Sequence, residues 1–186
     1  FLHADPQLTP PLLLSRALAA VRDAEGSRGA RVAGHFPLRF ERRQPGHDFF
    51  YRMLQEKTTL NRRDTINGDQ GALLSAAYFR ELGGFDERLP FLEDQRLAAR
   101  IFDTGRWLVL PGRLITSARR FETEGHHRLY TLMAIIMGMH AAKVSGFFER
   151  APKVYAAQQE TRALDVRPYL TLVRELLMEA GWKGAA

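Results

Sequence analysis

The sequence contains no cysteine, so neither a disulfide framework nor a thiolate metal site is available to it. Any bound metal must therefore use oxygen or imidazole ligands, which favours Mg²⁺ or Mn²⁺ over zinc. The most apolar run, Leu129 to Ala142, is too short to cross a bilayer and contains His140. We therefore expect no transmembrane helix there, but a helix that packs on the core or lies at a membrane surface.

The composition is that of a single domain with a C-terminal extension. The 186 residues are 45% hydrophobic, which is enough for a sizeable core. An excess of 27 Lys and Arg over 21 Asp and Glu gives a net charge of +6, which suits an anionic partner such as nucleic acid, acidic lipid or a nucleoside diphosphate. The arginine pairs are scattered and belong to no nucleic-acid-binding motif, so nucleic acid is not the favoured partner.

Alternating patterns and glycine stops predict a chain of alternating helices and strands. Pro37 favours an edge position for the first long strand. The expected strands are Ala30 to Glu41, Trp107 to Leu110 and Leu114 to Ser117, and Ala72 to Ser75 is expected to be a short strand or a turn. The expected helices are Thr9 to Glu25, His47 to Arg62, Ala76 to Leu82, Glu93 to Thr104, His126 to Phe148, Lys153 to Gln159 and Val166 to Ala180.

Two acidic sites stand far apart in the sequence. One is Asp5, at the end of the first apolar segment, and the other is Glu93-Asp94, which opens a helix after the glycine turn at residues 83–84. One carboxylate can hold a divalent cation while another accepts a proton from an attacking hydroxyl. Without further context, acids in a first helical turn also complement the helix dipole, and Asp5 is also explained as a loop acid.

Five strings in a fixed order make the pattern more specific, and they read HAD, GDQG, GGFDE, LEDQRLAAR and TSARRFE. With this order and spacing, the segment from about Phe1 to Glu122 resembles an inverting family 2 glycosyltransferase. The likeness is to a bacterial subgroup that reads roughly FLHADT, GDQ, GGF, MED and TSARRWE.

The resemblance implies an α/β fold, namely the C-terminal part of a glycosyltransferase A-type fold with a mixed sheet flanked by helices and extra C-terminal helices. Residues 1–122 would form the metal and acceptor side of the transferase domain, and residues 123–186 a helical extension. The strand–helix–strand half that grips the nucleoside would precede Phe1.

The resemblance also assigns roles to single residues. Asp94 would be the catalytic base, and Asp5 the ligand of Mn²⁺ or Mg²⁺. The residues that would bind substrate are Asp69, Gln70, Glu93, Arg119 and Arg120. These residues also have structural explanations, since an Asp in a turn caps its own backbone and paired arginines form a solvated edge. The pair His126-His127 is either the source of a third metal ligand or an exposed pair.

The implied function is transfer of a sugar, with inversion, from a nucleotide-sugar donor to the hydroxyl of a small or lipid-linked acceptor. The absence of a Gln-x-x-Arg-Trp element after Asp94 favours single-sugar transfer over polymer synthesis. The expected location is the cytoplasm, at the inner face of the membrane if residues 126–148 contact lipid. A non-catalytic sugar-binding or scaffold protein of the same fold is the alternative.

Overall fold

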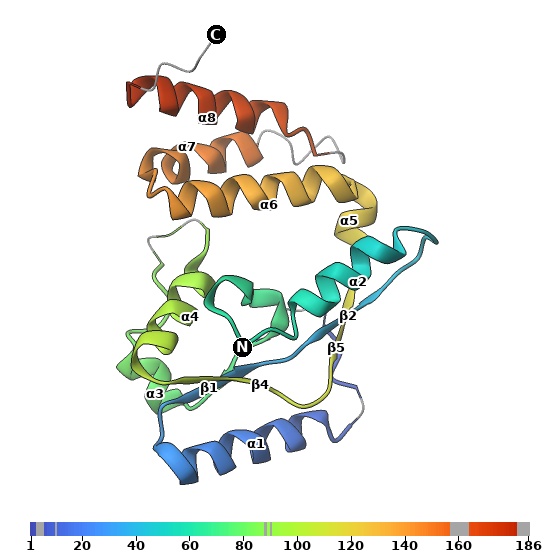
Figure 1. Cartoon of the computed structure of the whole chain (residues 1–186), viewed down its shortest axis with the longest axis vertical. Helices are drawn as coiled ribbons and strands as arrows, with labels where there is room; N and C mark the ends of the chain where they lie inside the picture. The colour runs from blue at the N-terminus through green and yellow to red at the C-terminus, as the bar shows by residue number, and fades with distance from the viewer. Residues whose placement is uncertain (3–5, 10, 88, 90, 157–163, 182–186) are drawn as a thin grey trace. The chain divides into compact units, whose positions relative to one another are not determined.

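The structure is a computed structural model that describes residues 1–2, 6–9, 11–87, 89, 91–156 and 164–181 (Figure 1). The chain divides into two compact units. The first comprises Phe1–Arg88 and Leu92–Ala118, and the second comprises Leu89–Phe91 and Arg119–Ala186. The division into a transferase domain up to Glu122 and a helical extension stays a prediction.

The first unit is built on a small mixed sheet. Its central strand, β1, pairs antiparallel with β3 and parallel with β4, and a second pair of parallel strands is formed by β2 and β5. The strands are β1 Val32–His35, β2 Leu38–Glu41, β3 Leu73–Leu74, β4 Arg106–Val109 and β5 Leu114–Ser117. The helices are α1 Leu13–Arg28, α2 Asp48–Lys57, α3 Ala76–Glu81 and α4 Glu93–Thr104, with short 3₁₀ turns at η1 Arg63–Thr65 and η2 Gly68–Gln70.

Helices cover both faces of this sheet (Figure 1). Successive strand residues point to opposite faces, so Val32 packs with α1 while its neighbour Ala33 packs with α3 and α4. The α1 side is filled by Leu13, Ala17, Val21, Phe36, Leu38 and Leu114, and the α4 side by Ile66, Tyr78, Leu97, Ala98, Ile101 and Trp107. The expected mixed α/β architecture with flanking helices is confirmed.

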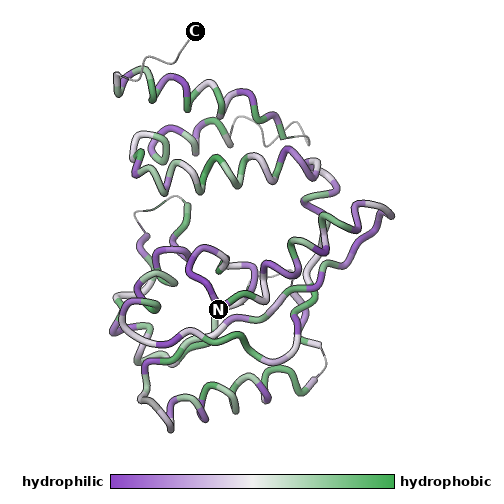
Figure 2. The backbone as a smooth tube through the Cα atoms, viewed as in Figure 1, coloured by the Kyte–Doolittle hydropathy of each residue, from purple (hydrophilic) through white to green (hydrophobic). Residues whose placement is uncertain are grey.

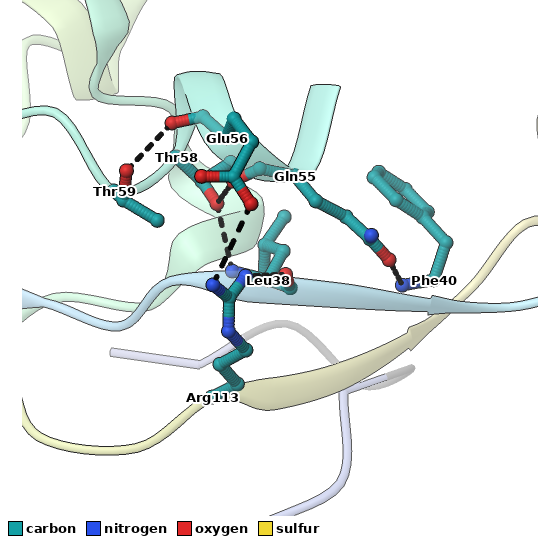
Figure 3. A network of polar contacts seen from close by, with 7 residues as sticks. All are labelled: Leu38, Phe40, Gln55, Glu56, Thr58, Thr59 and Arg113. Carbon is teal, nitrogen blue, oxygen red and sulfur yellow. Dashed lines mark hydrogen bonds and ion pairs between the residues drawn. The ribbon is translucent and has the colours of Figure 1, made fainter. Parts of the chain in front are cut away.

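On the side away from β5, the backbone N–H groups of β2 donate to side chains of α2 and of Thr58, the residue that follows it. The Leu38 N–H donates to Thr58 Oγ1 at 2.8 Å, and the Phe40 N–H donates to Gln55 Oε1 at 3.0 Å (Figure 3). These bonds satisfy two N–H groups that would otherwise be unpaired at the edge of the strand. Pro37, which has no N–H, lies just before β2 and divides the expected long strand into two.

Helix α4 has the boundaries that the sequence predicts, Glu93 to Thr104. It ends at Gly105, where an added Cβ would lie 2.3 Å from Tyr78 Oη and 2.5 Å from the Arg31 carbonyl oxygen. Close packing against α3 and the residue before β1 therefore leaves room only for glycine at this position. The short helix α3 is also confirmed, with Ser75 Oγ accepting from the Tyr78 N–H at 3.1 Å and Gly83 following in a positive-φ conformation.

The prediction for α1 is wrong at both ends. The helix begins at Leu13 without a side-chain cap, so Thr9 is not its capping residue, and it continues through Gly26. It ends at Gly29, whose φ of 94° and N–H bond to the Glu25 carbonyl complete the last turn. Gly29, rather than Gly26, occupies the position that favours glycine.

The apolar spacing predicted an inward face for α2, and that prediction is right only in part. The predicted face was Phe49, Phe50, Met53, Leu54 and Leu60. Leu54 is buried, together with Tyr51, whereas Phe49 is 81% exposed. The helix is also shorter than expected. It begins after His47, which has a φ of 57°, and it ends at Lys57 rather than Arg62.

The second unit contains α5 Arg119–Glu124, α6 His126–Ala141, α7 Ser145–Ala156 and α8 Arg167–Glu179. The predicted helix from His126 to Phe148 is two helices, because Lys143 adopts a φ of 57° between them. Arg150 on α7 pairs with Glu175 and Glu179 on α8. In Figure 2, the tube of α6 is green over much of its length, which marks hydrophobic residues. In the described part of the chain, no helix combines the length and apolar character needed to cross a membrane.

Candidate functional site

A cavity of about 370 Å³ in the first unit brings together the GDQG loop, the Glu93-Asp94 helix start and the residues after the glycine turn. Its volume falls within the range of roughly 300–1,000 Å³ that small-molecule sites occupy. The lining residues are Phe1, Leu2, Ile66, Asn67, Gly68, Gly71, Ala72, Phe85, Glu93, Asp94, Leu97 and Trp107.

Asp94 joins two of the motifs that the sequence singles out. Its Oδ2 atom accepts a hydrogen bond from the Gly68 N–H at 2.5 Å, and its Oδ1 atom accepts from the Gln95 N–H at 2.7 Å. An ionised carboxylate offers about four lone-pair sites, so each oxygen keeps one for a further partner. The carboxylate is therefore fixed in direction, half-buried, and still able to accept a further hydrogen bond from a group in the cavity.

The start of α4 has an uncommon backbone. Leu92, immediately before the helix, adopts a left-handed conformation with a φ of 63° and gives no side-chain cap. A non-glycine residue in this region costs on the order of 1–3 kcal/mol and is found often at functional sites. At this position the strained residue leads directly into Glu93 and Asp94, of which Glu93 is exposed and Asp94 is half-buried.

The glycine turn is tied to the same helix. The guanidinium of Arg100 donates to the carbonyl oxygens of Leu82 and Gly84, and Arg96 forms an ion pair with Asp86 at 3.1 Å. The Asp86 side chain is only 11% exposed, so this pair is better shielded than a surface ion pair. Two arginines of α4 therefore hold the segment that places Phe85 at the cavity.

Asn67 is positioned by a residue that sequence reasoning missed. Gln95 is buried, and its Nε2 atom donates to the Ile66 carbonyl oxygen and to Asn67 Oδ1, the latter at 3.2 Å. Gln95 lies one helical turn before Ala98 and two turns before Phe102, on the inward face of α4. A polar residue at such a position needs an internal partner, and that requirement is the signal that could have found it.

Of the GDQ residues, Gly68 lines the cavity, whereas Asp69 and Gln70 are not among its lining residues. The region expected to be a loop forms the short 3₁₀ turn η2, in which Asp69 is half-buried and Gln70 is fully buried. Gln70 Nε2 donates to the Thr65 carbonyl oxygen at 2.7 Å. The turn reaches the cavity through Asn67, Gly68 and Gly71, and substrate binding by Asp69 and Gln70 stays a prediction.

The described lining of this cavity does not include the remaining predicted site residues. Asp5 and His3 lie outside the described residues. Arg119 and Arg120 belong to the second unit, where Arg120 Nε donates to Glu124 Oε1 at 2.9 Å. His126 and His127 lie in the first turn of α6, and the His126 ring stacks on Phe121.

The described residues do not assemble a metal site by themselves. Over the ranges given for the structure, no group of three or more His, Asp or Glu side chains converges on one point. Glu93 and Asp94 are adjacent, and each Asp94 oxygen already accepts a backbone N–H. A role for Asp5 in binding Mn²⁺ or Mg²⁺ stays a prediction.

One wall of the cavity is apolar and aromatic. Phe1 contacts Phe79 and Phe85, with ring centroids 4.5 Å and 4.9 Å apart, and Phe79 contacts Phe85 at 5.3 Å. Backbone bonds between Phe1 and Ala72, of 2.7 Å and 2.9 Å, hold the first residues beside the GDQG loop. The sequence did not identify Phe1, Leu2 or Trp107 as residues of the site.

Trp107, which also lines the cavity, is fixed by a buried histidine. Trp107 Nε1 donates to His35 Nδ1 at 2.6 Å, and His35 Nε2 lies 2.9 Å from the Thr58 carbonyl oxygen. Since Nδ1 accepts, the proton is on Nε2, which donates to Thr58. Burial lowers the pKa of His35 from 6.5, against a smaller raising effect of the Thr58 hydrogen bond, so the ring is a neutral structural link.

Comparison with known proteins gives no match: neither a family model, nor a curated protein, nor a solved structure is significantly similar to this chain.

Proposed function

We propose that this protein is an inverting glycosyltransferase that transfers a sugar from a nucleotide-sugar donor to an acceptor hydroxyl. Its fold would be the C-terminal part of a glycosyltransferase A-type fold. The ordered motifs that resemble family 2 transferases support this proposal, as do the residues of three of them, GDQG, GGFDE and LEDQRLAAR, that line one cavity. The single observation that carries it is the hydrogen bond from Gly68 to Asp94, which unites the GDQ and Glu-Asp motifs.

In the proposed reaction, Asp94 accepts the proton of the acceptor hydroxyl. The acceptor oxygen forms a bond to the anomeric carbon of the sugar, and the bond from that carbon to the diphosphate oxygen breaks. The electron pair of the broken bond leaves with the nucleoside diphosphate, and attack from the opposite face inverts the configuration. Glu93, exposed beside Asp94 at the cavity, would bind acceptor hydroxyls.

The predicted cation would neutralise charge on the departing diphosphate. Asp5 is its proposed ligand, and this part of the proposal is separate from the role of Asp94. Calorimetric titration of the full-length protein with a nucleoside diphosphate, with and without Mn²⁺, tests it. We expect tighter binding with Mn²⁺ and loss of that gain in Asp5→Asn, whereas equal binding with and without Mn²⁺ would remove the metal from the proposal.

A non-catalytic binding protein is the second candidate, and one observation favours it. Both Asp94 oxygens accept backbone N–H groups, as they would if the carboxylate only joined α4 to the η2 turn. Activity separates the two candidates. The full-length protein is mixed with single nucleotide-sugars, Mn²⁺ and a cell extract as the source of acceptor, and release of nucleoside diphosphate is measured with and without the extract.

Acceptor-dependent release from one of the nucleotide-sugars would support the transferase. Tight binding of a nucleotide-sugar without any release would support the binding protein instead. Arg119 and Arg120 would contact the diphosphate in the transferase, and substituting both with Gln should then weaken donor binding.

Contact of residues 126–148 with a membrane surface is proposed separately. Leu129 and Leu132 are the buried residues of α6, while Ile135, Ile136 and Met137 are only half-buried. Flotation with anionic and neutral liposomes tests this contact. Binding to anionic liposomes that is reduced by Ile136→Ser would support it, and absence of binding to both kinds would contradict it.

A further inference from the structure

We infer that the cavity selects an acceptor that carries an aryl or other flat apolar group next to its reacting hydroxyl. This inference rests on the proposed function for the identity of the reacting hydroxyl. It goes further because it names the chemical class of the acceptor from the two unlike walls of the cavity.

The polar part of the lining, called the polar wall, consists of Asn67, Gly68, Glu93 and Asp94. These residues carry groups that can donate or accept hydrogen bonds from a ligand. The apolar part of the lining, called the apolar wall, is formed by Phe1, Leu2, Ile66, Phe85, Leu97 and Trp107. A ligand that fills such a cavity has both hydroxyl groups and an apolar surface. A sugar alone would leave much of the aromatic wall in contact with water.

The apolar wall also holds its aromatic residues in place. Phe1 and Leu2 are held against the cavity by the backbone pairing of Phe1 with Ala72. Contacts with Phe79 and Phe85 fix the Phe1 ring at the edge of the cavity. Aromatic rings fixed in this way favour offset or edge contacts with another ring.

The test compares two glycosides with the same hydroxyls, phenyl β-D-glucoside and methyl β-D-glucoside. Binding is followed by the fluorescence of Trp107 in a Trp182→Phe background of the full-length protein. Burial of a phenyl ring predicts that the phenyl glucoside binds roughly tenfold to a hundredfold more tightly. Equal affinities for the two glycosides would overturn the inference.

Two variants locate the preference on the protein. Phe85→Ser should remove most of the preference for the phenyl glucoside, while Phe49→Ser, the same change at a residue 81% exposed on α2, should leave it intact. Because Phe85→Ser also removes contacts with Phe1 and Phe79, a second variant, Ala72→Leu, fills the cavity while keeping it apolar. It should weaken binding of the phenyl glucoside at an unchanged circular dichroism spectrum.

Uridine is the third probe, because a nucleobase also has a flat face. Uridine that competes with the phenyl glucoside and binds more tightly would assign the wall to the donor and overturn the inference. These measurements need no turnover. A preference for the phenyl glucoside without any sugar transfer would therefore contradict the proposed function alone, and transfer without the preference would contradict this inference alone.

Discussion

The two walls of the cavity are built in different ways. The polar rim consists of a helix start and a turn joined by the Gly68 to Asp94 hydrogen bond, and Glu93 beside it is exposed. The apolar wall includes Leu97 and Trp107, which are 2% and 4% exposed and also belong to the core of the first unit. Substitutions in the polar rim should therefore lower turnover. Substitutions of the buried wall residues should first lower the free energy of unfolding.

Replacement of Asp94 by Asn has the largest expected effect. It removes the proton acceptor but preserves the shape, so turnover should fall by about 10²–10⁴-fold. Asp103→Asn, at the other end of α4, is the matched control, because Asp103 pairs with Arg63 at the surface and does not line the cavity. Steady-state kinetics with thermal unfolding measures both effects, and an active but less stable Asp94→Asn would make the residue structural.

Truncation of Leu97 should have the next largest effect, now on the free energy of unfolding. Leu97→Ala removes a buried side chain of α4 and should destabilise the first unit by about 2–5 kcal/mol. Leu14→Ala on α1 is the control, since Leu14 is 41% exposed and should cost within about 0.5 kcal/mol. Urea unfolding followed by Trp107 fluorescence measures both. Equal losses in the two variants would show that the wall is not part of the core.

Lowering the pH should reduce the free energy of unfolding through His35, by less than Leu97→Ala does. Its folded-state pKa is lowered by burial, so the unfolded chain takes up a proton first as the pH falls. The stabilising contribution is complete above pH 6.5 and is lost as the pH falls from 6.5 toward the lower folded-state pKa. His35→Gln should flatten this acid dependence, while His127→Gln, on the exposed start of α6, should not. Identical slopes for the wild type and His35→Gln would contradict the prediction.

The sequence predicted those elements whose ends are set by local chemistry. Helix α4 follows its apolar spacing and stops at Gly105, and β5 was predicted from Leu114 to Ser117. Other element ends did not follow the sequence signals. Gly26 has the composition of a helix stop but lies within α1, and the break between α6 and α7 depends on one residue, Lys143, in an uncommon conformation.

The site was predictable in part for the same reason. The Glu-Asp and GDQ motifs were found from their order, but their contact joins residues 26 positions apart, and no spacing rule predicts it. The aromatic wall could not be predicted, because Phe1, Phe85 and Trp107 come from distant segments and each has an ordinary role as a packing residue.

The most direct test measures kcat and the acceptor KM for Asp94→Asn and Phe85→Ser side by side in the full-length protein. Loss of a group that acts only in the transition state lowers kcat, whereas loss of uniform binding raises KM. We predict that Asp94→Asn lowers kcat by about 10²–10⁴-fold with little change in KM, and that Phe85→Ser raises KM with little change in kcat. An unchanged kcat in Asp94→Asn would contradict the division of the cavity into a chemical rim and a recognition wall.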